Sequence, residues 1–128
     1  MNKIIVVLLA GFVCIACGEK KNQEDFGKPS ESTPAQDQLA LGKKLFEGVG
    51  LCHTCHKTDQ KIIGPSVKEI AKIYKDMNLD MVAFLRGELE PVVDPEQYEV
   101  MKTNFTVTKA MTDEELRAIE AYFYSFVK

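Results

Sequence analysis

The chain of 128 residues has no tryptophan, only two histidines and no cluster of basic residues longer than two. With a formal net charge of −3, it lacks the basic patch of a nucleic-acid-binding protein. It contains no serine–histidine–acid arrangement, no glycine loop suited to phosphate and no carboxylate pair typical of catalysis. No segment shows the alternating pattern of a β-strand. These absences leave the four cysteines, which form two pairs in the sequence, as the most informative residues.

Residues 1–17 have the features of a targeting segment. Lys3 gives a positive start, and an uninterrupted apolar run follows over residues 4–13, which is too short to span a membrane comfortably. The run ends in the first cysteine pair, Cys14-Ile15-Ala16-Cys17. Small residues before a cysteine resemble the lipobox of bacterial lipoproteins, in which the cysteine is lipidated and becomes the mature N-terminus.

The lipobox resemblance implies that Cys17 is the lipidated residue, because the small Ala16 precedes it. Cys14 follows the bulkier Val13 and stands where lipoproteins usually have leucine, which is a departure from the pattern. An ordinary secretory signal and an uncleaved anchor remain alternatives. All three interpretations predict an exported domain on the periplasmic side, and lipidation predicts that it is anchored to the membrane.

The rest of the chain divides into a linker and a domain. Residues 18–36 are polar and rich in Ser, Glu, Lys and Pro, so they cannot bury enough apolar surface to fold and are expected to be flexible. Such a linker spans about 25 Å on average, which lets a tethered domain reach neighbouring complexes. Residues 37–128 form the single domain that a chain of this length predicts.

The domain is predicted to be all-α, with about four helices. The last of these helices carries a clear apolar stripe at helical spacing. Two expected caps are followed three residues later by Glu, as in a capping box, and Gly87 is expected to end the third helix. Residues 88–111 lack strong periodicity and are predicted to form a long loop, which in a small domain usually has a function. The expected N-caps, in chain order, are Asp37, Ser66, Asn78 and Thr112.

The second cysteine pair lies in Cys52-His53-Thr54-Cys55-His56. Two cysteines at this spacing can each form a thioether with a vinyl group of haem, and the following histidine can bind the iron. A redox dithiol, half of a zinc site and a chance match are the alternatives. A dithiol of the thioredoxin type needs a βαβ setting, and ligands this close make poor tetrahedral zinc geometry. The motif therefore favours one haem c bound by Cys52 and Cys55, with His56 as the proximal ligand and His53 away from the iron.

Over roughly residues 38–127 the chain resembles the class I cytochromes c. The expected first helix carries Gly42 and an aromatic residue four positions later, and Gly64-Pro65 follows the haem motif. A methionine in a loop and a last helix with an aromatic residue complete the resemblance. It implies the cytochrome c fold around one covalently attached haem. It also implies that the first and last helices cross closely at Gly42 and Tyr122, because glycine has no side chain there.

The resemblance also implies the groups around the iron. In the family, the carbonyl of the proline in Gly-Pro accepts a hydrogen bond from the proximal histidine, which assigns that role to Pro65, a residue that also begins the next helix. The distal ligand is a methionine in a loop, and Met101 matches it. Many members have Met-x-Pro-Asn there, whereas residues 101–104 are Met-Lys-Thr-Asn, without the proline. Of the other candidates, Met77 and Met81 are expected in the core, and Met111 as an apolar residue before a helix cap.

The predicted function is that of an electron carrier rather than an enzyme. Iron bound by His56 and Met101 has no open position, so it passes electrons but does not readily bind a substrate. By analogy, the expected partners are quinol-oxidising complexes, terminal oxidases and reductases of nitrogen oxides. Cleavage before Cys17 removes one lysine and no acid from 16 basic and 19 acidic residues, and the resulting charge of −4 favours a partner with a positive patch. Two alternatives stay open: a ligand-binding or peroxidase-like haem domain with an open distal site, and a fixed haem subunit of a larger complex.

Overall fold

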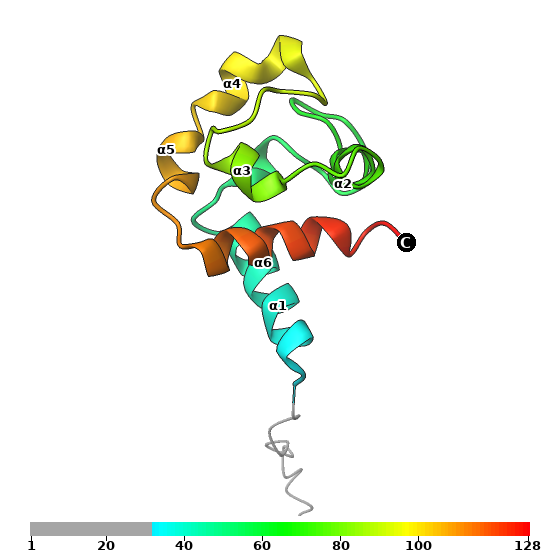
Figure 1. Ribbon diagram of the computed structural model, residues 1–128, viewed down its shortest axis with the longest axis vertical. Helices are drawn as coiled ribbons and strands as arrows, with labels where there is room; N and C mark the ends of the chain where they lie inside the picture. Colours follow the sequence, from blue (N-terminus) through cyan, green and yellow to red (C-terminus); the bar gives the residue numbers. More distant parts are fainter. Residues whose placement is uncertain (1–31) are drawn as a thin grey trace, which may run out of the picture. The chain divides into compact units, whose positions relative to one another are not determined.

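A computed structural model describes residues 32–128 (Figure 1). The predicted targeting segment, including Cys17, and most of the predicted linker lie outside the described residues. Within residues 32–128 the chain is helical and has no β-strand, which confirms the predicted all-α class. The α-helices are α1 Pro34–Glu47, α2 Val67–Asp76, α3 Met81–Leu85, α4 Tyr98–Lys102, α5 Phe105–Thr108 and α6 Asp113–Tyr124, and the 3-10 turns are η1 Cys52–Thr54 and η2 Pro95–Gln97.

Helix α1 begins earlier than the sequence indicated. Thr33 is its N-cap, and Thr33 and Gln36 exchange the two side-chain hydrogen bonds of a capping box. Pro34 occupies the first helical position, where its missing N–H costs nothing. The prediction of Asp37 as N-cap was therefore wrong. Asp37 lies in the first turn, where its negative charge is favourable near the positive end of the helix dipole.

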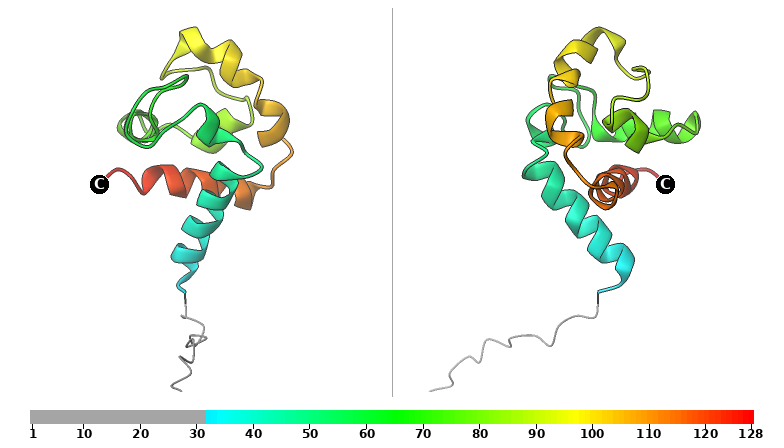
Figure 2. Two further views of the ribbon diagram at one scale, coloured as in Figure 1. Left: turned by 180° about the vertical axis from the view of Figure 1, so that it is seen from behind. Right: turned by 60° about the vertical axis from the view of Figure 1, so that its left-hand side comes forward.

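The first and last helices cross closely, as predicted, at Gly42 (Figure 2). A Cβ atom at Gly42 would lie 2.0 Å from the backbone oxygen of Ala118 and 2.8 Å from the Cβ of Tyr122. Next to the crossing, the Phe46 ring packs against Tyr122 and Phe123, with ring centroids 5.3 and 5.6 Å away. Only glycine allows this approach, so the crossing fixes how α1 leads into the haem motif.

Helix α2 begins at the predicted cap. Ser66 accepts a hydrogen bond from the backbone N–H of Glu69 at 3.1 Å, which is one half of the expected capping box. The helix buries Val67, Ala71 and Tyr74 on one face and exposes lysines on the other. Because its buried residues recur at helical spacing, α2 could be predicted from the sequence.

Helix α3 has a different cap from the predicted one. Asp80, not Asn78, accepts the hydrogen bond from a backbone N–H in the first turn, that of Ala83 at 3.1 Å. Asn78 has a left-handed backbone with φ of 50° and belongs to the turn after α2, a conformation that asparagine tolerates. Gly87 ends the helix as predicted: its φ is 74°, and the N–H groups of Gly87 and the following residue bond back to α3 carbonyls.

Residues 88–111 are not one long loop, because they contain η2, α4 and α5. These helices have three to five residues each, so they are too short to show the periodicity that predicts a helix. Helix α5 is anchored by the buried Phe105 and by Thr108, whose hydroxyl donates to the carbonyl of Leu85 at 2.6 Å. Helix α6 then opens on the predicted capping box of Thr112 and Glu115.

The core lies where α6 meets α1, α2 and α3. Its fully buried side chains include Leu116 and Ile119 from α6 and Val67 from α2. Helix α4 lies on the other side of α3 from α1, and α5 leads from it back to α6 (Figures 1 and 2). No helix among residues 32–128 is long and apolar enough to cross a membrane.

Candidate functional site

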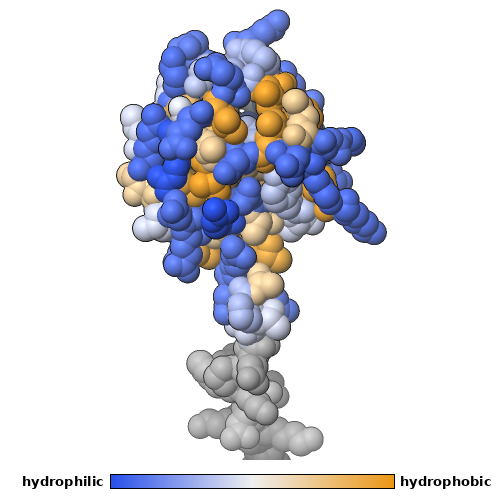
Figure 3. Space-filling view, viewed as in Figure 1, coloured by the Kyte–Doolittle hydropathy of each residue, from blue (hydrophilic) through white to orange (hydrophobic). Residues whose placement is uncertain are grey.

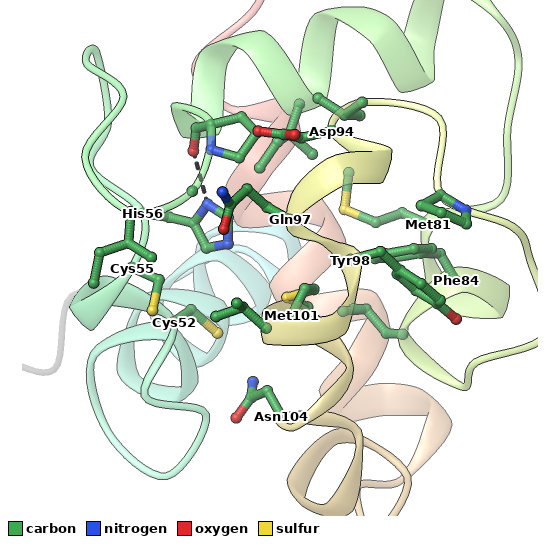
Figure 4. Close-up of a pocket in the computed structure, with 18 of the residues that line it drawn as sticks. Cys52, Cys55, His56, Met81, Phe84, Asp94, Gln97, Tyr98, Met101 and Asn104 are labelled. Carbon is green, nitrogen blue, oxygen red and sulfur yellow. Dashed lines mark hydrogen bonds between the residues drawn. The ribbon is translucent and has the colours of Figure 1, made fainter.

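A cavity opens between the haem motif and the segment that carries α4 (Figure 4). It offers about 270 Å³ of space to the centre of a water molecule. Most of its lining residues are apolar, and several of these also reach the surface, where the viewed face shows apolar groups among hydrophilic residues (Figure 3). The large apolar side chains that line the cavity and are exposed are Leu51, Ile63, Val92 and Val100.

The haem motif forms one tight turn on one side of this cavity. Leu51, with a left-handed φ of 52°, leads into η1. The N–H groups of Cys55 and His56 both bond to the carbonyl of Cys52, at 3.2 and 2.9 Å. Both cysteines and His56 line the cavity, and both cysteines are free thiols. Burial raises the pKa of the Cys52 thiol to about 11, so that thiol is neutral at pH 7.

The imidazole of His56 is held by the backbone that follows the motif. Its Nδ1 lies 2.7 Å from the carbonyl oxygen of Pro65, the pair predicted from the sequence. Burial lowers the pKa of His56 against the opposing effect of this hydrogen bond. The neutral ring donates Nδ1–H to Pro65, which leaves its second nitrogen, Nε2, with the free lone pair that a metal ligand needs.

Gly64 has a role at this site that the sequence alone did not reveal. A Cβ atom at Gly64 would lie 2.5 Å from Cε1 and 2.9 Å from Nδ1 of His56. The glycine therefore makes room for the imidazole directly beside the carbonyl that orients it. Gly64 thus supplies the space for the His56 ring, and Pro65 supplies the carbonyl that accepts its hydrogen bond. The sequence shows the Gly-Pro pair but not why the glycine is needed.

The second histidine of the motif points elsewhere. The Nδ1 atom of His53 lies 3.4 Å from the carbonyl oxygen of Phe46, near the end of α1, and His53 does not line the cavity. In the part of the chain that the structure describes, no group of three or more His, Cys, Asp or Glu residues is arranged to hold a metal ion. The described residues therefore give no support to a zinc site built from the motif.

The four methionines after the motif occupy three kinds of environment. Met101, half-buried on α4, and Met81, buried on α3, both line the cavity (Figure 4). Met81 thus packs in the core as predicted and is also a cavity wall. Met111 is buried just before the cap of α6, as predicted. The expectation for Met77 was wrong: it is the C-cap of α2 and 55% exposed, because the chain turns away from the core there.

Aromatic rings close the side of the cavity behind α4. Phe84 lies between Tyr74, Tyr98 and Phe105, with ring centroids 6.1, 6.3 and 5.5 Å away. Tyr74, Phe84 and Tyr98 line the cavity. The rings meet at steep angles, as aromatic residues do in well-packed interiors. Phe84 and Tyr98 thus form an apolar wall across the cavity from the two cysteines (Figure 4).

The donor set of this cavity fits haem c. Two free thiols at the attachment spacing, a neutral imidazole with one available nitrogen and a thioether sulfur all line one apolar space. These groups come from two parts of the chain, since Cys52, Cys55 and His56 belong to the motif and Met101 to α4. Thiols suit the vinyl groups, and the imidazole and thioether suit the iron.

Comparisons with known proteins agree with this fit. The model of one protein family, described as Cytochrome c, matches residues 39–125, which is more than half of the chain. The match includes the motif, the Gly-Pro pair, α4 and the whole of α6. A comparison with curated proteins finds no match.

Proposed function

The chain belongs to the cytochrome c family, and on that premise we propose that it is an exported class I cytochrome c whose single haem iron is bound by His56 and Met101. Family membership implies a covalently bound haem c, and the family consists in general of electron carriers rather than enzymes. When bound, the haem accepts and donates single electrons, while the protein supplies ligation, exclusion of water and a docking surface. The observation that carries the proposal is the one cavity shared by Cys52, Cys55, His56 and Met101.

Each residue of the motif has a distinct task in this proposal. Cys52 and Cys55 hold the group in place through thioethers, one to each vinyl. His56 provides the proximal nitrogen, and the Pro65 carbonyl fixes the angle of its ring. Gly64 keeps the ring in contact with that carbonyl. None of these tasks needs a side chain to move, which suits a carrier that must change little in geometry between its two states.

Met101 is the better of the two methionines in the cavity. Met81 is 2% exposed and packs in the hydrophobic core, so pulling its side chain toward an iron atom would leave a void there. Met101 is only half-buried on α4, a helix without buried residues, so less core packing is lost if its thioether binds the iron. With His56 and Met101 bound, the iron has no open position, which favours electron transfer over catalysis.

Absorption spectra of the haem-loaded protein test this assignment. We expect a low-spin spectrum with the sulfur-to-iron charge-transfer band, unchanged by carbon monoxide. Met101→Ala should abolish the band and lower the reduction potential, because thioether ligation favours reduced iron. Met81→Leu is the matched control and should keep both. A high-spin spectrum, or ready binding of carbon monoxide by the unmutated protein, would instead support a ligand-binding or peroxidase-like haem domain.

Export and lipidation at Cys17 complete the proposal. Cytochrome c domains are typically exported, and the lipobox-like sequence before Cys17 supports a lipid anchor. Labelling cells with radioactive palmitate tests the anchor. Cys17→Ser should lose the label and leave the membrane fraction, whereas Cys14→Ser should keep both. Label retained in the Cys17 variant would contradict lipidation at this residue.

The electron partner is inferred to have a positive patch. Residues 88–99 contain five acidic and no basic residues, and the same segment lines the cavity from Pro91 to Asp94. Glu88, Glu90 and Glu96 are exposed and form no ion pair with another residue of the described part. Like charges at the mouth of a redox site steer an oppositely charged partner toward it. Quinol-oxidising complexes, terminal oxidases and nitrogen oxide reductases are the classes of partner we propose.

Small charged reagents test this surface without knowledge of the partner. The haem should exchange electrons faster with cationic hexaammineruthenium as salt falls, and more slowly with anionic ferricyanide. Glu90→Gln should weaken the salt dependence for both reagents. Glu114→Gln, which changes the same charge at the start of α6, is the control and should change it less. Equal effects of the two substitutions would show that net charge, and not this segment, controls the encounter.

A further inference from the structure

The segment that carries Met101 is attached at both of its ends to residues that flank the haem motif. We call residues 94–104 the distal strap; it contains η2 and α4. At its start, Asp94 pairs with Lys61 at 2.7 Å. At its end, the side-chain amide of Asn104 donates to the carbonyl oxygen of Gly50 at 3.1 Å. Gly50 and Lys61 lie on opposite sides of the motif in the sequence, so the two contacts join the strap to both flanks of the motif.

The apolar contacts of this strap come from the half-buried Tyr98 and Met101, and the Tyr98 ring packs against Phe84 and Phe105. Neither η2 nor α4 has a buried residue, whereas α5, which follows directly, is anchored by the buried Phe105 and Thr108. Helices of this length have little stability of their own. Polar contacts therefore matter more for the position of Met101 than they do for a residue of the core.

The two polar contacts differ in environment. The side chain of Lys61 is 59% exposed and that of Asp94 is 16% exposed, so water and salt reach the pair from the lysine side and weaken it. Asn104 is half-buried and lines the cavity, so water competes less for its hydrogen bond. Asn104 is also three residues from Met101, whereas Asp94 is seven residues away on the far side of η2.

The carbonyl that Asn104 reaches is itself fixed. The N–H of Gly50 bonds to the carbonyl of Leu45 at the end of α1, at 2.9 Å. A Cβ atom at Gly50 would lie 2.7 Å from that same carbonyl oxygen, so the backbone is packed closely against α1. Asn104 thus ties the strap to a point set by the α1–α6 crossing, next to Cys52.

We propose that Asn104 is the positioning residue for Met101, holding the α4 end of the distal strap against the Gly50 carbonyl, while the Lys61–Asp94 pair has a minor part. The inference rests on the proposed function in one respect, that Met101 binds the iron. Loss of the Asn104 donor frees the end of α4, and Met101 then leaves the iron more often. An external ligand can take the vacated position at those moments.

Titration of the oxidised, haem-loaded protein with imidazole tests this role. Imidazole competes with Met101, and loss of the charge-transfer band reports the exchange. Asn104→Asp keeps the shape of the side chain and removes the donor, so apparent imidazole binding should tighten about tenfold, the upper range for one hydrogen bond. Asn104→Leu, neutral and similar in size, separates the lost donor from the added charge and should give the same shift. Asp94→Asn should shift binding less than about twofold.

A control separates positioning from general stability. Thr108→Val removes a buried hydrogen bond to Leu85 on the adjacent helix, so it should lower the stability of the protein and leave imidazole binding unchanged. Unchanged binding in both Asn104 variants would overturn the inference, as would a shift in Asp94→Asn as large as theirs. A missing charge-transfer band in the unmutated protein would overturn the proposed function itself and this inference with it, so the two failures are distinguishable.

Discussion

The two walls of the cavity are built in different ways. The proximal wall, residues 50–67, is held by backbone hydrogen bonds within itself, such as Gly64 N–H to Cys55 and Val67 N–H to Lys57, both at 2.9 Å. The distal wall, residues 88–104, contains only short helices without buried residues, and side chains attach it to its surroundings. The proximal wall therefore holds its own shape through its backbone, whereas the position of the distal wall depends on its side-chain contacts.

The largest expected effect comes from the fixed wall. Gly64→Ala places a methyl group 2.5 Å from Cε1 of the His56 ring. The ring is held by its hydrogen bond to the Pro65 carbonyl and Gly64 by its backbone bond to Cys55, so neither can yield easily. We expect a loss of about 3 kcal/mol in the free energy of unfolding, the upper range for overpacking. Urea denaturation of the haem-loaded protein measures the loss, and its absorption spectrum should change as the ring is displaced. A stable variant with an unaltered spectrum would show that the proximal wall is as adaptable as the distal one.

A glycine that leads into the distal wall should be easier to replace. Gly87 has φ of 74°, so alanine there adopts a left-handed backbone at a cost of about 1–2 kcal/mol. The atoms nearest to the added methyl are at the end of the flexible Lys109 side chain, 2.9 Å away, which can swing aside. Gly87→Ala should therefore destabilise less than Gly64→Ala and leave the haem spectrum unchanged. An altered spectrum would mean that strain passes from α3 to the iron ligands.

The smallest expected effect concerns the ion pair between the walls. The hydrogen bond that Asp94 accepts from Lys61 lowers the pKa of Asp94 below the ordinary value of about 4. A carboxyl with a depressed folded-state pKa stabilises the fold above its unfolded-state pKa, and this stabilisation is lost as pH falls through the folded-state value. Asp94→Asn should thus lower the melting temperature slightly near pH 7, and this difference should vanish once the pH is below the folded-state pKa of Asp94. A difference that persists in acid would point to packing of Asp94 against the cavity instead of charge.

The contrast between the walls also explains what could be predicted from the sequence. Local patterns predicted the proximal side: the spacing of the motif, the cap at Ser66 and the Gly-Pro pair each depend on neighbours in the chain. The capping box at Thr112 was predictable for the same reason. The distal side depends on contacts such as that between Asn104 and Gly50, which are 54 residues apart and leave no periodic signal.

Errors at the helix starts have a local origin. Thr33 and Asp80 are both caps that the sequence displayed, yet Asp37 and Asn78 offered the same chemistry a few residues away. When two residues have equal propensity to cap a helix, the one that is used depends on where the apolar face of the helix meets the core. Short helices such as α4 were missed because a helix of five residues has too few positions for an apolar face to repeat.

The burial of Cys52 also affects how the two thiols of the motif can react in the folded chain. Disulfide formation requires a thiolate to attack, and with a pKa of about 11 only about one Cys52 thiol in ten thousand is ionised at pH 7. Cys55 lies three residues away, so in an oxidising environment an intramolecular disulfide is the obvious competitor of haem attachment. In the folded chain, burial therefore removes Cys52 as an attacking group and leaves that role to the half-buried Cys55.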